Sequence, residues 1–200
     1  MLSRQFLAIK NWPWKRINFI RDDSTFQSNY VTLKKKLENA MKRHDYISWE
    51  EYFMGIALLS ARRSKDPNTQ VGACIVNKDN IILSTGYNGM PKGCSDDVLP
   101  WERDGSFQDT KYAYVCHAEL NAILNSDGRS LADSILYVTC FPCNECAKAI
   151  IQAGIKKVVY LEDKYPDADA TQVSRRLFKM ANITLKEFLN PAFYRELSLY

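Results

Sequence analysis

Two clusters of thiol, imidazole and carboxylate side chains, each directly ahead of an apolar helical run, constrain this chain more than any other feature of its sequence. The first is VCHAELNAIL, which contains Cys116, His117 and Glu119. The second is FPCNECAKAI, which contains Cys143 and Cys146. Burying a polar or charged group without a partner costs several kcal/mol. The fold must therefore supply partners for these groups.

The second cluster places two thiols on one face of a helix. Cys143 and Cys146 stand at i and i+3, and Pro142 suits the first helical turn. A helix N-terminus favours the thiolate, which is the form that binds metal. A Cys-x-x-Cys pair alone can also be a redox site or a buried pair. Since RQFLAIKNWPW lacks the apolar core of a secretory signal, we expect reduced thiols rather than a disulfide framework.

The first cluster makes this pair a candidate zinc site. Catalytic zinc takes three protein ligands and leaves its fourth position for water, and His117, Cys143 and Cys146 form such a set. On a regular helix His117 and Glu119 would point about 200° apart. We therefore predict that His117 lies at or before the first helical position and that one Zn²⁺ per chain lies at two helix N-termini. A closed structural site that adds Cys116 is the alternative, but it gives Glu119 no role.

Glu119 is the candidate catalytic residue. It is not a ligand, so it can take a proton from a zinc-activated water and pass it to a substrate. The order His-x-Glu followed by Pro-Cys-x-x-Cys is typical of the zinc-dependent nucleobase deaminases.

Strand and helix patterns alternate after residue 48 and predict an α/β fold. Ser48 and Glu51 predict a capping box at the start of the first helix. A polar turn joins two strands into an antiparallel hairpin, and the later crossovers predict a mostly parallel sheet with helices on both faces. The predicted helices cover 48–64, about 118 onwards, 143–154 and 170–181, and the predicted strands cover 71–76, 81–86, 135–140, 156–161 and 183–188.

Charge divides the chain into parts. Residues 1–44 carry ten Lys and Arg against three Asp and Glu, whereas residues 45–200 carry seventeen against twenty. We predict a basic, partly disordered extension at 1–44 with a short helix in VTLKKKLENAMKRH, a zinc-dependent domain at 45–190 and a tail at 191–200. The mildly acidic main part disfavours binding along a nucleic acid, and no apolar stretch approaches the roughly 20 residues of a membrane span. We expect a cytoplasmic protein, or a mitochondrial one if residues 1–21 act as a presequence.

Four longer motifs extend these observations over roughly Asp45 to Phe188. They are RSKDPNTQVGACIVN, GYNGMPKGCSDD, YVCHAELNAI and FPCNECAKAIIQAGIKKVVY. With them the chain resembles the deoxycytidylate deaminases of the cytidine/deoxycytidylate deaminase family. The resemblance implies a three-layer α/β/α cytidine-deaminase-like fold, with a mixed sheet of about five strands. It also implies zinc-dependent hydrolysis of dCMP to dUMP and ammonia, which supplies thymidylate synthesis, in a homo-hexamer.

Candidate substrate residues lie on three segments. Ser64, Lys65 and Asn68 follow the first helix, where a loop could wrap a monophosphate, although a solvated helix end explains each of them equally well. Asn88 matches a position that contacts the sugar in related deaminases, with turn chemistry as the alternative. Tyr114 stands just ahead of the zinc histidine, with core packing as the alternative.

The long loop GYNGMPKGCSDDVLPWERDG is the candidate regulatory segment. The resemblance implies a second nucleotide site, where dCTP with Mg²⁺ activates and dTTP inhibits. Asn88, Gly89, Lys92 and Arg103 are its candidate residues, because glycines let backbone amides approach phosphates and the two cations supply charge. A surface loop at the mouth of the active site is the alternative.

Other functions fit parts of the same sequence. A related deaminase could act on free cytidine or on adenosine in tRNA, although tRNA would require a basic face. A zinc-stabilised binding module leaves Glu119 unexplained. A Cys-x-x-Cys redox protein would differ in a metal assay.

Overall fold

The structure, a computed structural model, describes residues 28, 30–36 and 42–190 of the 200-residue chain. The chain divides into two compact units, residues 1–46 and 47–200. In the first unit residues 30–36 are helical, which overlaps the short helix predicted there. The presequence predicted at 1–21, most of the partly disordered extension predicted at 1–44, and the tail at 191–200 lie outside the described residues. In the part of the chain that is described, no helix has the length and hydropathy needed to cross a membrane.

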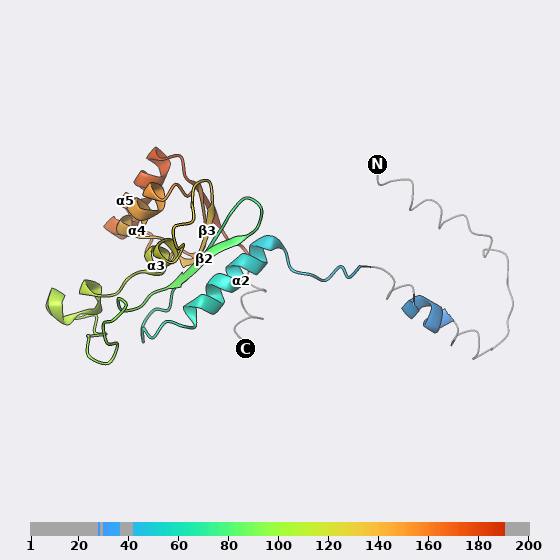
Figure 1. Cartoon of the computed structure of the whole chain (residues 1–200), viewed down its shortest axis with the longest axis horizontal. Coiled ribbons are helices and arrows are strands. Elements are labelled where there is room, and N and C mark those ends of the chain that lie inside the picture. The colour runs from blue at the N-terminus through green and yellow to red at the C-terminus, as the bar shows by residue number, and fades with distance from the viewer. Residues whose placement is uncertain (1–27, 29, 37–41, 191–200) are drawn as a thin grey trace. The chain divides into compact units, whose positions relative to one another are not determined.

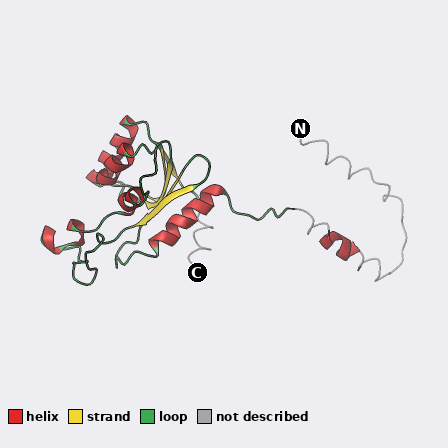
Figure 2. Ribbon diagram, in the orientation of Figure 1, coloured by secondary structure: helices red, strands yellow, loops and turns green. Residues whose placement is uncertain are grey.

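A mixed five-stranded sheet forms the centre of the second unit (Figure 2). The strands are β1 (Gly72–Val76), β2 (Ile82–Tyr87), β3 (Ile135–Cys140), β4 (Lys157–Glu162) and β5 (Thr184–Glu187). Their order across the sheet is β2-β1-β3-β4-β5. β1 is antiparallel to both β2 and β3, whereas β3, β4 and β5 run parallel. Every predicted strand is confirmed. The predicted hairpin is antiparallel, and the predicted parallel pairing is found among β3, β4 and β5.

Helices cover both faces of this sheet, which confirms the three-layer α/β/α fold (Figure 1). The four helices of the second unit are α2 (Trp49–Ala61), α3 (Ala118–Leu124), α4 (Asn144–Gln152) and α5 (Asp169–Met180). The predicted capping box is present, because Ser48 Oγ accepts the Glu51 amide and the Glu51 carboxylate accepts the Ser48 amide. This box fixes where α2 begins.

Each face of the sheet has its own core. On one face Phe53 and Met54 of α2 pack with Cys74 and Val76 of β1. On the other face Ala73 and Ile75 of the same strand pack with buried residues of α3, α4 and α5. Side chains of a strand alternate between faces, so one fully buried strand serves both cores.

A glycine brings α3 close to the sheet and so fixes where the site lies. A Cβ on Gly86 of β2 would lie 2.3 Å from Ala118 O and 2.4 Å from Ala122 N. Only glycine permits this approach of a helix backbone to a strand. At the next turn of the chain, the amides of Gly89 and Cys116 pair with each other's carbonyls at 3.1 and 2.9 Å. These contacts hold the residues just ahead of α3 against the end of β2.

The long connection from β2 to α3 is mostly irregular, as predicted. It contains two short 3₁₀ helices, Phe107–Asp109 and Lys111–Ala113. It is anchored at Lys111, which is buried. The connection therefore reaches the interior beside α3 even though it has little regular structure.

Candidate metal centre and active site

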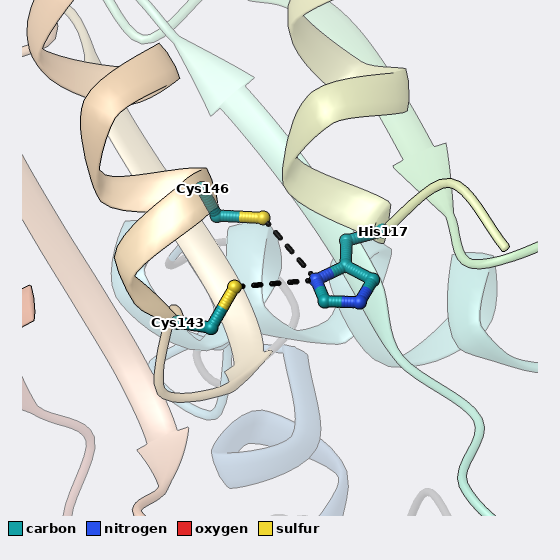
Figure 3. Close-up of side chains that lie close together, drawn as sticks. All are labelled: His117, Cys143 and Cys146. Carbon is teal, nitrogen blue, oxygen red and sulfur yellow. Dashed lines mark hydrogen bonds between the residues drawn. The ribbon is translucent and has the colours of Figure 1, made fainter. Parts of the chain in front are cut away.

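Two helix N-termini bring three metal-binding side chains together (Figure 3). His117 is the N-cap residue of α3, Cys143 is the N-cap residue of α4, and Cys146 lies in the first turn of α4. His117 Nδ1 lies 3.4 Å from each of the two sulfur atoms. All three ligand atoms lie within 4.8 Å of one another. His117 therefore stands just before the helix, where the angle argument from the sequence requires it.

These distances fit a tetrahedral zinc ion. Zn–S bonds of about 2.3 Å and Zn–N bonds of about 2.0–2.1 Å at tetrahedral angles place sulfur and nitrogen about 3.5 Å apart, and the structure has 3.4 Å. Cys116, the fourth ligand of the alternative closed site, does not belong to the group. Three protein ligands leave one position for water or substrate, as in catalytic zinc sites.

Protons compete with a metal for these ligands. A hydrogen bond from Cys146 lowers the pKa of Cys143 to about 3, with a further contribution from His117. The same hydrogen bond between the two sulfur atoms, together with burial, raises the pKa of Cys146. A hydrogen bond with Cys143 raises the pKa of His117 to about 9. A divalent ion replaces the protons that the three groups share, so metal affinity rises with pH.

Glu119 lies beside the metal group without belonging to it. Its side chain is in the first turn of α3 and is 4% exposed, and burial raises its pKa. It lines a cavity of about 270 Å³ together with His117 and Cys143, which we call the deep cavity. A buried carboxyl group with a raised pKa can both accept and return a proton near neutral pH.

Known proteins match the stretch of sequence that contains this site. Residues 47–162 match the family model described as "Cytidine and deoxycytidylate deaminase zinc-binding region". The chain belongs to this family. Deoxycytidylate deaminase of Homo sapiens is 60% identical over 149 residues, 74% of this chain and 84% of the human protein. Probable deoxycytidylate deaminase of Drosophila melanogaster is 51% identical over 165 residues, 80% of this chain and 81% of that protein.

A solved structure supports the same assignment. The dCMP deaminase of cyanophage S-TIM5, in complex with dCMP and dUMP, is 31% identical and superposes with a TM-score of 0.58. The match covers 72% of this chain and 100% of the phage protein. The chain is thus a zinc-binding deaminase with a cytidine-deaminase-like fold.

A buried ion pair forms one wall of the deep cavity of this deaminase. Lys111 Nζ lies 2.5 Å from Asp66 Oδ2, and the two side chains are 9% and 2% exposed. Asn88 Nδ2 donates to the same carboxylate oxygen at 3.3 Å, and Asn88 Oδ1 accepts the Val71 amide at 2.8 Å. Sequence analysis missed the pair, because Lys and Asp are rarely buried and the two residues are 45 positions apart. Only the Asp-Pro-Asn-Thr turn hinted at Asp66, whose carboxylate accepts the amides of the turn.

The predicted substrate residues are divided by the fold. Asn88 lines the deep cavity, whereas Ser64, Lys65, Asn68 and Tyr114 do not. Ser64 Oγ donates to the Asn88 backbone carbonyl at 2.8 Å, so it helps to fix the position of Asn88. Lys65 pairs with the Asp96 carboxylate.

Tyr114 points elsewhere, because its hydroxyl donates to the Gln108 carbonyl at 2.8 Å. Two residues earlier, Tyr112 lines the deep cavity instead. Asn68 lies in a different depression, beside the C-terminal half of α2. No sequence pattern distinguishes the two tyrosines, because Tyr112 lies in the three-residue 3₁₀ helix and Tyr114 directly follows it, a segment too short to show a period.

The predicted effector residues also fall into two places. Gly89 and Lys92 line a second pocket of about 240 Å³, which we call the outer pocket and which also contains Arg63, Lys65 and Asp96. Arg103 and Asn88 line the deep cavity with Glu119. The long loop thus contributes to both cavities.

Proposed function

We propose that this chain catalyses the zinc-dependent hydrolysis of dCMP to dUMP and ammonia and so supplies dUMP for thymidylate synthesis. The observation that carries the proposal is the position of Glu119, which lines one cavity with His117 and Cys143 of the metal group. The identity to deoxycytidylate deaminases over most of the chain supports the choice of dCMP. So does the phage relative in complex with dCMP and dUMP.

The residues around the deep cavity have different roles in this reaction. One Zn²⁺ per chain, when bound, makes water acidic enough to supply a nucleophile at neutral pH. His117, Cys143 and Cys146 would hold that ion. The Glu119 carboxylate can take up the proton that the attacking water must lose, and it can deliver protons to the base ring and to the departing ammonia. Because Glu119 is buried, these transfers do not have to compete with bulk solvent. The sum is dCMP plus water giving dUMP plus ammonia.

Asn88 holds the wall against which the nucleotide lies. Its side chain bonds to Asp66, to the Thr69 carbonyl at 2.9 Å and to the Val71 amide, so its position is fixed before substrate enters. A preorganised wall lowers the entropy cost of positioning a substrate.

The proposal extends to regulation and assembly. We propose a homo-hexamer in which dCTP with Mg²⁺ activates and dTTP inhibits by binding at the outer pocket. Arg63, Lys65 and Lys92 line this pocket, and Gly89 and Gly93 leave backbone amides accessible to phosphates. Mg²⁺ would offset the remaining phosphate charge.

One set of assays tests the activity. Ammonia release from dCMP, CMP, deoxycytidine and cytidine is measured side by side on purified protein, with zinc determined by metal analysis. We expect dCMP to be preferred and the zinc content to be near one per chain. Preference for cytidine would move the protein to a related activity, and a zinc content near two would reveal an additional ligand set.

Further measurements test regulation and location. The rate should be sigmoidal in dCMP without effector and hyperbolic with dCTP and Mg²⁺, and the hexamer should be visible by light scattering. Unchanged curves at millimolar dCTP and dTTP would contradict the regulatory proposal. A fluorescent fusion of residues 1–30 distinguishes the proposed cytoplasmic location from a mitochondrial one.

A further inference from the structure

We propose that Arg103, with Thr171 and the first turn of α5, binds the 5′-phosphate of the substrate and makes this deaminase prefer a nucleotide to a nucleoside. The inference rests on the proposed activity on dCMP. It assigns Arg103 to the substrate rather than to the effector.

The deep cavity has a buried end and an exposed end. Glu119 and Cys143 line it near the metal group, where the base must react. Tyr112 and Tyr165 also line it and are 55% and 47% exposed. A nucleotide whose base reaches Glu119 therefore directs its phosphate toward the exposed end, beside these tyrosines.

Arg103 is the cation available at that end. Three basic side chains line the deep cavity: His117, Lys111 and Arg103. His117 belongs to the metal group, and the Asp66 carboxylate already neutralises Lys111 at 2.5 Å. Arg103 Nε donates to the Tyr112 hydroxyl at 3.1 Å, and among the described residues no carboxylate lies within ion-pair distance of it. A guanidinium held by a neutral hydroxyl keeps its charge and most of its donors for a ligand.

The start of α5 faces the same space. Its N-cap residue is Ala168, which has no side chain to accept the first amides. Ala168, Ala170 and Thr171 line the deep cavity, whereas the acidic neighbours Asp167 and Asp169 do not. Free amides at a helix N-terminus favour a phosphate group.

Thr171 supplies an independent sign of a ligand. Thr171 is 7% exposed and lines the cavity, and within the described part of the chain its hydroxyl makes no hydrogen bond to another residue. Its oxygen is not among the fully buried, unpaired side-chain atoms of the described residues, so the hydroxyl is open to the cavity and can bond to a ligand there. A phosphate oxygen between Thr171 and Arg103 would satisfy this hydroxyl and the guanidinium at once.

The test compares substrates with and without the phosphate. Full-length, zinc-loaded Arg103→Ala is assayed on dCMP and on deoxycytidine. Loss of a charge-assisted hydrogen bond should lower kcat/KM for dCMP about 10- to 150-fold, mainly through KM. The kcat/KM for deoxycytidine should change less than about threefold. Arg103→Lys should recover part of the dCMP activity, and Thr171→Val should show a smaller loss in the same direction.

Two further measurements complete the test. Arg176→Ala removes an exposed arginine of α5 that does not line the cavity, and it should leave both substrates unaffected. Inhibition by dUMP and by deoxyuridine gives the same comparison from binding alone. Arg103→Ala should weaken inhibition by dUMP and leave inhibition by deoxyuridine unchanged.

The outcomes separate this inference from the proposed function. Equal losses on dCMP and deoxycytidine would give Arg103 only a structural role, and no loss would remove it from the site. If Arg103→Ala alters the response to dCTP but not the ratio of kcat/KM for dCMP to kcat/KM for deoxycytidine, Arg103 binds the effector rather than the substrate. If the wild-type protein deaminates deoxycytidine but not dCMP, both proposals are wrong. If the wild type and Arg103→Ala turn over dCMP equally well, the inference about Arg103 is wrong and the proposed activity stands.

Discussion

The deep cavity and the outer pocket are built from the same two loops, but they differ in burial and in charge. Lys65 lines the outer pocket while its neighbour Asp66 lines the deep cavity, and Gly89 and Asn88 are divided in the same way. The Lys65–Asp96 pair has side chains 59% and 28% exposed, whereas those of the Lys111–Asp66 pair are 9% and 2% exposed. Neighbours in an extended loop point to opposite sides. At these two loops the deep cavity therefore holds a buried ion pair, and the outer pocket holds a partly exposed one.

The largest effect should come from the buried end of the deep cavity. Glu119→Gln should retain zinc but lower turnover of dCMP by at least about 10²-fold, the low end for general acid–base catalysis. A larger loss is expected because the residue serves more than one proton transfer. The measurement is kcat with zinc content determined on the same sample. Retention of more than about a tenth of wild-type activity would mean that another group moves the protons.

The two ion pairs should differ strongly in stability. Lys111→Met leaves the Asp66 carboxylate buried without its cation, which should cost about 3–5 kcal/mol of unfolding free energy. Lys65→Met breaks an exposed pair and should leave the denaturant midpoint almost unchanged. Chemical unfolding of both variants checks the contrast. If Lys65→Met is the more damaging of the two, the surface pair is a structural element and the comparison fails.

The outer pocket should affect regulation rather than chemistry. Lys92→Ala should weaken the responses to dCTP and dTTP, within the range of about 5- to 150-fold that allosteric couplings typically span. The rate at saturating dCMP should stay close to wild type, because Lys92 does not line the deep cavity. Titration of each effector at fixed dCMP measures this. A variant with normal effector curves would show that the nucleotides bind elsewhere.

The smallest effect should come from outside both cavities. A chain that begins at Asp45 keeps every residue of the deep cavity and of the outer pocket. Its kcat/KM for dCMP should therefore match that of the full chain. Aggregation of the shortened chain would instead assign residues 1–44 a role in folding or assembly.

Local signals predicted the elements well, because each depended on neighbours in sequence. Ser48 and Glu51 bond to each other within one turn, and the position of His117 follows from the angle between residues on a helix. The same reasoning failed for Asp66 and Lys111, whose pairing depends on where an irregular loop crosses the interior. Arg103 was predicted beside Lys92 because they share a loop, but the fold places them in different cavities. The course of the chain through the folded domain, rather than residue type, determines where Asp66, Lys111 and Arg103 lie.

The N-cap positions of α3 and α4 have one further consequence. Ser48 caps α2 with its own side chain, but neither His117 nor Cys143 makes a capping bond to its helix. Both side chains turn toward each other instead, across 26 positions of sequence. An ion held there joins two helix starts that lack side-chain caps, and it closes a loop of the chain as a disulfide would. A zinc ion bound by these residues would thus also act as a cross-link, so chelation should loosen the contact between α3 and α4 as well as stop the reaction.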